Sequence, residues 1–531
     1  MTRWVMVADL ERCVGCQTCT AACRHANATS PAVQWRKVLD IEAGSYPNVS
    51  RTFVPVGCQH CADPPCMHVC PTTATRRRSD GIVTIDYDIC IGCAYCDVAC
   101  PYQARFKIDA PRFAYGSRGL QNELEREDPS RLGVAQKCTF CSDRIDFGLA
   151  RGLTPGLDPR ATPACVNSCI ATALHFGDID DPNSNVSRLL DERRNFRMHE
   201  EIGTDPGFYY AYGRADARTQ PSERSAAVSA MGAGSLRTRG VEPWHQQHWD
   251  WKAAGNFICG GAGSSLFAWV AIASLRYGSL FPLGLVALAL VALGLFLVLL
   301  KIGRPLRSIN VLRQPQRSWM AREAWVATAF LPLGALAALF DFPALTVITA
   351  LLAFLFLFSQ AMILREAKGI PTWRTSLIVP LIVTTGLAEG GGLLLATTGF
   401  IPSLHPIVTT IAAVVVALAA LRSWAWGSYL TGLRIEGTPT RALAMLDAFR
   451  HWFFICGLVV PLALILGGLM LAGATPYLFA FAGLCAFASG AALKFILVAR
   501  AGYNQGFALK HTPVRGSGIA GPAVKPGWSV G

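Results

Sequence analysis

Sixteen cysteines gathered in four groups before residue 170 are the residues of this sequence whose spacing most clearly indicates chemistry. Three cysteines separated by two residues can bind one cube of iron and sulfide, while a fourth points away and binds the neighbouring cube. At four thiolates per cube, the sixteen cysteines predict four 4Fe-4S clusters. The groups are Cys13-x2-Cys16-x2-Cys19-x3-Cys23, Cys58-x2-Cys61-x4-Cys66-x3-Cys70, Cys90-x2-Cys93-x2-Cys96-x3-Cys100 and Cys138-x2-Cys141-x23-Cys165-x3-Cys169.

Structural zinc is the alternative ligand for these cysteines, because four-cysteine zinc sites also use pairs of cysteines two residues apart. A zinc site combines two such pairs and leaves no role for a third cysteine followed by a displaced fourth. In the second and third groups this fourth cysteine, Cys70 or Cys100, directly precedes a proline. The spacing therefore favours iron-sulfur clusters over zinc.

A row of such clusters is a path for electrons. A cube held by four thiolates keeps no iron open to a substrate, so these groups predict electron transfer by a non-catalytic subunit. Three further cysteines, Cys259, Cys456 and Cys485, stand alone in apolar stretches and are typical of packing residues. Because no apolar segment of signal-peptide length separates Met1 from Cys13, we expect the clusters to be assembled in the reducing cytoplasm.

The composition requires a second part of the chain that lies in lipid. Of the 531 residues, 52% are hydrophobic and only 16% are charged, which is too apolar for a soluble protein of this length. Between the two parts the sequence turns to Ser, Ala, Gly and Arg without periodicity, as in a linker. We predict a four-cluster ferredoxin-like domain over 1–212, a linker over 213–250, a membrane anchor with a quinone site over 251–505 and a cytoplasmic tail over 506–531.

Eight apolar stretches follow residue 250, and each has about the ~20 residues that a helix needs to cross the hydrocarbon of a bilayer. Helices are required because lipid offers no partner for an open backbone polar group. The predicted fold is an α+β ferredoxin-like domain with four 4Fe-4S clusters, followed by an all-α bundle of eight transmembrane helices. The stretches are 254–275, 280–300, 324–340, 343–364, 376–399, 405–421, 452–473 and 477–499.

Basic residues mark one side of this bundle. They fill the connections after the second, fourth and sixth stretches and the C-terminal tail, whereas Arg276 is the one basic residue in the opposite connections. The positive-inside rule then places the iron-sulfur domain and the C-terminus on the cytoplasmic side of the inner membrane. The seventeen residues are Lys301, Arg304, Arg307, Arg313, Arg317, Arg322, Arg365, Lys368, Arg374, Arg422, Arg434, Arg441, Arg450, Arg500, Lys510, Arg515 and Lys525.

The net charge of +13 is therefore explained by membrane orientation. A nucleic-acid partner is the other explanation of such a charge, but basic residues concentrate next to the hydrophobic segments, where membrane orientation explains them more simply. We expect membrane lipid as a partner and no nucleic acid.

Several cysteine segments resemble the four-cluster iron-sulfur subunit of the dimethyl sulfoxide reductase family. They are 57–61, 64–72, 90–101 and 137–144. The resemblance implies that the first group pairs with the fourth and the second with the third. The implied cubes are held by Cys13, Cys16, Cys19 and Cys169; by Cys23, Cys138, Cys141 and Cys165; by Cys58, Cys61, Cys66 and Cys100; and by Cys70, Cys90, Cys93 and Cys96.

The membrane half is similar to the anchor subunit of the same enzymes, which is normally a separate protein. Residues 301–307 and 318–323 match the quinone-site region of that anchor. In the family a histidine often stands where this chain has Lys301, and an ammonium and an imidazole titrate far apart. The resemblance implies a quinone site near Lys301, Arg307 and Glu323.

The same residues suit a quinone for a chemical reason. A quinol releases two protons with its two electrons, so its pocket needs a titratable group close to the membrane surface. For Glu323 the structural alternative is an ion pair with Arg322 or Arg307, and for Arg307 the positive-inside placement alone is a sufficient explanation.

Glu389, within the glycine-rich stretch 386–392, is the acidic residue that lies deepest in a predicted helix. A carboxyl at that depth is costly unless it is neutral or paired, so proton handling and a packing role both stay open for it. Lys494, near the end of the last stretch, is expected to extend its ammonium towards the surface.

The resemblance implies an electron-transfer and membrane-anchor subunit that links the membrane quinone pool to a separate molybdopterin catalytic subunit. A reductase of dimethyl sulfoxide or another oxide, as in anaerobic respiration, would draw electrons from quinol. A sulfite dehydrogenase would deliver them to quinone, and the cytoplasmic placement favours this sulfite-oxidising branch. The alternative is a redox-driven, proton-translocating membrane protein, in which Glu389 would be the central residue.

Overall fold

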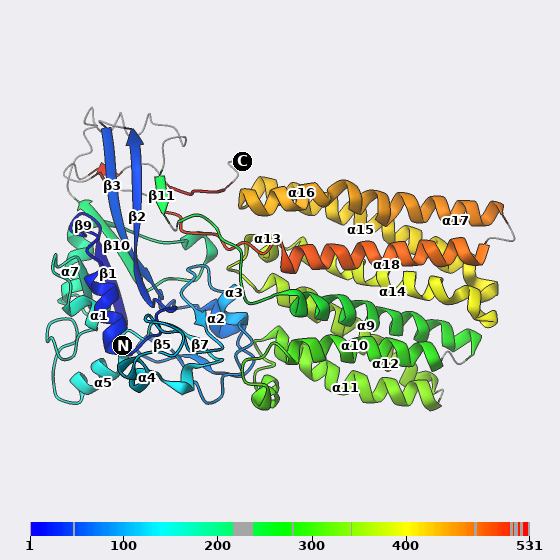
Figure 1. Cartoon of the computed structure of the whole chain (residues 1–531), viewed down its shortest axis with the longest axis horizontal. Helices are drawn as coiled ribbons and strands as arrows, with labels where there is room; N and C mark the ends of the chain where they lie inside the picture. Colours follow the sequence, from blue (N-terminus) through cyan, green and yellow to red (C-terminus); the bar gives the residue numbers. More distant parts are fainter. Residues whose placement is uncertain are drawn as a thin grey trace. The chain divides into compact units, whose positions relative to one another are not determined.

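The computed structural model divides the chain into two compact units (Figure 1). The cysteine-rich unit comprises Met1–Trp244 and Asn504–Trp528, and the helical unit comprises His245–Tyr503. Most of the predicted linker, 216–236, lies outside the described residues, so the predicted domain boundaries stay predictions. The structure describes residues 2–45, 48–215, 237–239, 241–278, 281–340, 342–471, 475–509, 513–514, 519–520 and 524–528.

A four-stranded sheet in the order β8-β1-β10-β9 forms the frame of the cysteine-rich unit. Strand β1 (Trp4–Asp9) runs parallel to β10 (Phe208–Arg214) and antiparallel to β8 (Leu174–Asp178), while β9 (Arg193–Arg197) runs antiparallel to β10. Every residue of β1 is buried, which explains its continuous apolar sequence. The sheet thereby joins segments from both ends of the predicted ferredoxin-like domain.

The two faces of β1 pack against different partners. Val5 and Val7 pack with Val186 of α7 (Asn185–Glu192) on one face. The alternate side chains, including Met6, belong to the core that contains buried cysteines of all four groups. The sheet therefore supports the cysteine segments on one face and is closed by a helix on the other.

Short elements carry the rest of this unit. A second sheet has three strands in the order β11-β2-β3. Its β2–β3 hairpin lies between the first and second cysteine groups along the sequence and pairs Arg36 with Gly57. The other elements are β2 (Arg36–Ser45), β3 (Asn48–Gly57), β11 (Arg237–Arg239), β4 (Thr75–Arg77), β5 (Val83–Ile85), β6 (Phe106–Lys107), β7 (Ala135–Gln136), β12 (Pro513–Val514), β13 (Ile519–Ala520), α1 (Thr18–Asn27), α2 (Pro65–His68), α3 (Tyr95–Val98), α4 (Gln121–Arg126), α5 (Ser142–Leu149), α6 (Ala164–Asn167), η1 (Pro129–Arg131) and η2 (Glu200–Ile202).

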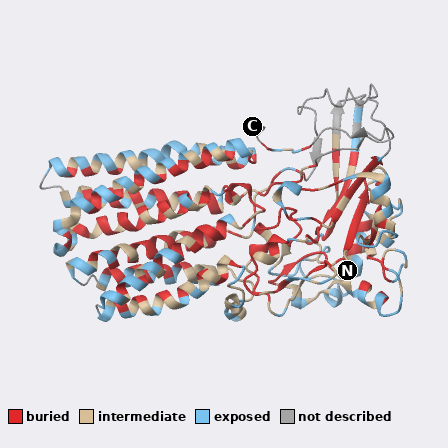
Figure 2. Cartoon of the chain, turned by 180° about the vertical axis from the view of Figure 1, so that it is seen from behind, coloured by how far each residue is buried: buried red, intermediate tan, exposed pale blue. Residues whose placement is uncertain are grey.

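The helical unit contains eight segments of the described chain that are long and apolar enough to cross a membrane, which confirms the predicted bundle of eight helices. Figure 2 shows buried residues between the helices and many exposed ones on the outward faces. The helices are α9 (Trp251–Tyr277), α10 (Phe281–Leu299), η4 (Pro305–Arg313), α11 (Trp319–Phe340), α12 (Pro343–Arg365), α13 (Pro371–Arg374), α14 (Ile378–Thr397), η5 (Thr398–Phe400), η6 (Pro402–Ile407), α15 (Val408–Glu436), α16 (Thr440–Phe454), η7 (Ile455–Val459), α17 (Val460–Met470) and α18 (Thr475–Ala499).

The sixth helix is longer than predicted, because it continues through Arg422 to Glu436. Assigning Arg422 to a cytoplasmic connection is therefore wrong. Its side chain is fully buried, and its guanidinium donates hydrogen bonds to the carbonyl oxygens of Ala486 (2.8 Å) and Gly457 (2.8 Å) and to Oγ of Ser489 (2.7 Å). These acceptors take hydrogen bonds from both terminal nitrogens of the guanidinium inside the bundle, so the helix continues past this charge.

Glycines let the central helix α14 approach α18 closely. A Cβ at Gly483 of α18 would lie 2.2 Å from the carbonyl oxygen of Gly392 in α14, whereas a Cβ at Gly427 of α15 would meet nothing within 4 Å. The contact of α14 with α18 therefore depends on the absence of side chains at this crossing.

We expect Gly483→Ala to lower the thermal unfolding temperature of the detergent-solubilised protein. The added methyl group forces the two helices apart, and such overpacking typically costs about 1–3 kcal/mol. Gly427→Ala is the matched control and should leave the unfolding temperature unchanged or slightly higher. Equal behaviour of the two variants would contradict the close helix crossing.

Candidate functional site

The cysteine groups share a local design in which a C-x2-C loop turns through left-handed backbone conformations. In the first group φ is 71° at Gly15 and 63° at Gln17, and in the third group it is 72° at Gly92 and 60° at Ala94. Residues other than glycine rarely adopt positive φ, and such strain persists where the surroundings or a ligand impose it. Short helices then provide further cysteines: Cys19 and Cys23 on α1, Cys66 on α2, Cys96 on α3 and Cys165 on α6.

The fold brings the cysteines together in four sets. Set 1 contains Cys19 with Cys13 and Cys169, whose charges act on it. The charges of neighbouring thiols define the other sets in the same way. Thiols of the fourth group act on Cys23 in set 2, and Cys100 acts on Cys61 in set 3. Thiols of the second and third groups act on Cys96 in set 4. The members of sets 2 to 4 are Cys23, Cys138, Cys141 and Cys165; Cys58, Cys61, Cys66 and Cys100; and Cys70, Cys90, Cys93 and Cys96.

Each set combines two groups in the nested order, first with fourth and second with third. Cys16, the remaining cysteine of the first group, is exposed, and hydrogen bonding with Thr18 lowers its pKa. Spacing alone left this pairing open; the sets agree with the nested order that the resemblance implies, and the assignment of ligands to cubes stays a prediction.

The thiols are suited to binding iron. All sixteen are free of disulfide bonds, and most are buried. Burial raises the pKa of Cys138 and Cys165 to about 11 and that of Cys100 to about 12. A buried thiol with a raised pKa is costly to ionise alone, and a metal that replaces the proton removes this cost.

Three buried cations accompany the sets, and none of them was among the residues predicted from the sequence. Arg36 begins β2, Arg105 precedes β6 and Lys137 directly precedes Cys138; each is at most 3% exposed. Lys and Arg are almost never fully buried without a partner. The one sequence signal is that Lys137 directly adjoins the fourth cysteine group along the chain.

In the helical unit, Glu323 is buried on α11 and faces two amide side chains. Its carboxyl lies within hydrogen-bonding reach of Gln360 on α12 and Asn256 on α9. Its neighbour Arg322 turns elsewhere: the guanidinium donates to the carbonyl oxygens of Pro315 (2.7 Å) and Gln316 (2.8 Å). Glu323 therefore lies in an amide-lined environment rather than in an ion pair with Arg322.

The other two predicted quinone residues lie in the segment that joins α10 to α11. Lys301 follows α10, and its Nζ lies over the ring of Trp249 at 5.2 Å from the ring centroid. Arg307 lies in η4 and is partly exposed. Lys301 and Arg307 are both less buried than Glu323.

Glu389 is fully buried on α14 and forms an ion pair with Lys494 of α18, with 2.5 Å between Oε2 and Nζ. The expectation that Lys494 extends to the surface is wrong, since its side chain is 0% exposed. A carboxylate at the same depth offers the ammonium a nearer partner than water does. Arg422 of α15 is close enough for its charge to act on Glu389 as well.

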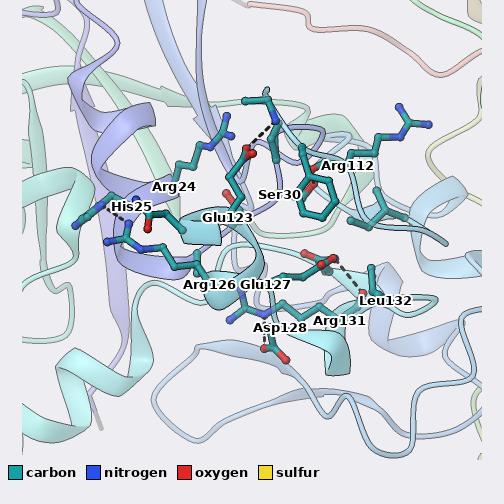
Figure 3. Close-up of a pocket in the computed structure, with 18 of the residues that line it drawn as sticks. Arg24, His25, Ser30, Arg112, Glu123, Arg126, Glu127, Asp128, Arg131 and Leu132 are labelled. Atoms are coloured by element: carbon teal, nitrogen blue, oxygen red, sulfur yellow. Dashed lines mark hydrogen bonds and ion pairs between the residues drawn. The ribbon is translucent and has the colours of Figure 1, made fainter. Parts of the chain in front are cut away.

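A surface pocket of about 590 Å³ lies between α1 and α4 of the cysteine-rich unit, and no predicted site residue lines it. Figure 3 shows that several of its ionisable side chains hydrogen-bond or pair locally, as Arg131 does with Asp128 at 3.0 Å and Arg126 with His25 at 3.2 Å. Such local pairs are typical of a solvated protein surface rather than of an active site.

Comparison with known proteins assigns both parts of the chain to families. Residues 49–113, which contain the second and third cysteine groups, match the 4Fe-4S dicluster domain family. Residues 275–433 match the family described as DMSO reductase anchor subunit (DmsC). The membrane half is thus that of a multi-pass anchor.

Curated relatives match about two fifths of this chain and most of their own length. A selenate reductase subunit of Mesobacillus selenatarsenatis is 40% identical over 224 residues, 39% of this chain and 71% of the relative. A putative dimethyl sulfoxide reductase iron-sulfur subunit of Halobacterium salinarum is 41% identical over 227 residues, 40% and 80% of the two chains. A sulfite dehydrogenase subunit of Allochromatium vinosum is 37% identical over 227 residues, 40% and 83%.

The predicted resemblance is confirmed for both halves, and an iron-sulfur part and an anchor part are joined here in one polypeptide. The chain belongs to the family of iron-sulfur electron-transfer subunits of dimethyl sulfoxide reductase type, with the membrane anchor of that type fused behind it.

Proposed function

We propose that this protein carries electrons between a quinone in the membrane and a separate molybdopterin catalytic subunit, through four 4Fe-4S clusters. The observation that supports it best is the gathering of cysteines from four groups into four sets: sets 2, 3 and 4 each have the four thiols that one cube needs, and set 1 has three. Each cube would accept or release one electron when bound, and the cysteines of the four sets would hold the cubes.

The proposed ligands of each cube follow the sets. Set 1, including Cys16, would bind the first cube, and sets 2, 3 and 4 would bind the others. Interleaving keeps paired cubes close, because Cys23 belongs to set 2 while its neighbour on α1, Cys19, belongs to set 1. The chain's own part in electron transfer is therefore to fix the distances between cubes and to keep water away from the buried sulfurs.

Glu323 is the residue best suited to exchange a proton with a quinol. Its carboxyl is buried, and the amides of Gln360 and Asn256 can orient it without neutralising it. Lys301 and Arg307 lie in the segment before α11, where they would contact the polar edge of the quinone ring. The quinone site is proposed on these three residues.

The partner and the orientation are proposals too. Relatives are named both as reductases of selenate and dimethyl sulfoxide and as a sulfite dehydrogenase, so the direction of electron flow would depend on the catalytic partner that binds. The basic connections support an inner-membrane protein whose iron-sulfur domain and C-terminus face the cytoplasm.

A second candidate function, redox-driven proton translocation, is favoured by the buried charges on α14, α15 and α18. Glu389, Lys494 and Arg422 bring three ionisable groups from three helices to one region of the bundle interior. Intramembrane ionisable residues are commonly functional. A static ion pair that joins helices accounts for the same contacts, so an experiment must distinguish proton translocation from a structural role.

Purified, anaerobically prepared protein should contain about sixteen irons per chain, because sixteen cysteines at four per cube bind four cubes. Iron and zinc would be measured together by elemental analysis, with acid-labile sulfide as the check on cluster type. Tightly bound zinc in place of iron, or about eight irons, would contradict the four-cluster proposal.

Glu323→Gln should slow reduction of the clusters by a quinol analogue by at least about tenfold, since positioned proton transfer contributes roughly 10²–10⁴-fold to rates. The substitution keeps the shape of the side chain, so iron content and the unfolding temperature should stay unchanged. Glu436→Gln, at an exposed carboxyl on α15, is the matched control. Stopped-flow absorbance of the clusters gives the rate, and equal rates for both variants would remove Glu323 from the site.

Lys494→Met should destabilise the protein by about 3–5 kcal/mol, because it leaves Glu389 buried without its ion-pair partner. The double variant Glu389→Leu with Lys494→Met should recover most of that stability. If the pair is structural, the double variant in proteoliposomes should match the wild type in quinol-linked electron transfer and in the accompanying pH change of the proteoliposome lumen. Loss of the pH change alone, with electron transfer intact, would support proton translocation.

A further inference from the structure

The buried cations of the cysteine-rich unit are Arg36, Lys137 and Arg105, and their surroundings are unusual. A buried cation is normally balanced by a carboxylate. Here, within the described residues, the largest attractive charges on all three come from cysteine sulfurs. Their natural counter-charge is therefore whatever the sulfurs hold.

Each cation faces two different sets of cysteines. Arg36 is acted on by Cys165, Cys138 and Cys23 of set 2 and by Cys19 of set 1. This position is the junction between the first two proposed cubes.

Arg105 occupies the same position at the other end of the row. It is acted on by Cys66, Cys58 and Cys100 of set 3 and by Cys96 of set 4. Lys137 fills the middle junction, because Cys58 and Cys66 of set 3 and Cys138 of set 2 act on it. The order of sets 1, 2, 3 and 4 thus has one cation at each of its three junctions.

Each cation is also held in place by contacts other than charge. Arg105 donates from Nη2 to Sγ of Cys66 (2.9 Å) and from Nη1 to Oγ1 of Thr75 (3.0 Å). A side chain anchored at both ends of its guanidinium cannot swing to solvent when a neighbouring sulfur changes its charge.

The other two cations have fixed neighbours as well, although Nε and Nη1 of Arg36 are buried without a hydrogen-bond partner among the described residues. Arg36 lies over the ring of Phe208 at 4.9 Å from the centroid, with Nη2 3.0 Å from Sδ of Met6. Nζ of Lys137 donates to the carbonyl oxygens of Val83 and Cys138, two acceptors that suit an ammonium.

We propose that Arg36, Lys137 and Arg105 are electrostatic positioning residues for electron transfer, each favouring an electron on either of the two cubes that it faces. The inference rests on the proposed four-cluster function. In each step one electron leaves a reduced cube and enters its oxidised neighbour, and the cation between them keeps its charge. A fixed positive charge in a low-dielectric interior stabilises the more negative, reduced cube on both sides.

The arrangement explains why one cation stands at each junction rather than beside single cubes. A cation next to one cube alone would favour that cube and hold the electron there. A cation shared by two cubes lowers the energy of both, so it does not by itself hold the electron on either of them. Three shared cations would connect the four levels in sequence.

Arg105→Met and Arg36→Met test the proposal in the full-length, detergent-solubilised protein. Iron content is measured first, and redox titration followed by electron paramagnetic resonance then gives the midpoint potential of each cube. Each variant should lower the reduced-to-oxidised ratio of two cubes by about tenfold at a given potential, which corresponds to about 59 mV for one electron. Arg105→Met should shift one pair of cubes and Arg36→Met the other pair.

Further variants separate charge from structure. Arg105→Lys keeps the charge and should restore most of the shift, while Arg77→Met, at an exposed arginine on the neighbouring β4, should change nothing. Lys137→Met should shift one cube of each pair. Unchanged potentials in variants with full iron content, or an equal shift of all four cubes in every variant, would overturn the proposal.

Two failures stay distinguishable. Wild-type protein with fewer than sixteen irons would contradict the four-cluster function itself. If Arg105→Met loses iron, Arg36→Met decides the question on its own pair of cubes, because a purely structural cation would leave the potentials of the retained cubes where they were.

Discussion

Burial of sulfur is the constraint on which the cysteine-rich unit depends. Thiols that are removed from water are held neutral by their surroundings, so iron that replaces the protons contributes directly to the stability of the fold. The loops that carry them adopt left-handed backbone at Gln17 and Ala94, and long regular elements are few in the described part of this unit. The apolar core under β1 supplies the frame, and metal ligation by the buried sulfurs would add to its stability.

The helical unit solves a similar problem with charges of its own. Glu389 and Lys494 neutralise each other in the interior, and Arg422 donates hydrogen bonds to carbonyl oxygens and to Ser489. In lipid each of these groups alone would be expensive. Together with the glycines between α14 and α18 they fix which helices meet, so the same residues that suggest proton chemistry also hold the bundle together.

Periodicity and composition predicted much of this protein correctly. The eight membrane-spanning segments and the iron-sulfur and anchor families were readable from apolar length and cysteine spacing, because both signals are local in the chain. The errors were non-local. Lys494 was expected at the surface and Arg422 in a connection, since hydropathy treats each charge by itself and cannot detect a partner far away in the sequence.

The sequence by itself determined the ligands: sulfur atoms at spacings that suit cubes of iron, and apolar segments that suit a bilayer. Only the tertiary structure shows which cysteines lie close enough for their charges to act on one another, and that Arg36, Lys137 and Arg105 are each acted on by cysteines of two sets. The physical reason is that ligand type is a property of single residues, whereas the field at a site is the sum of charges brought together from distant parts of the chain.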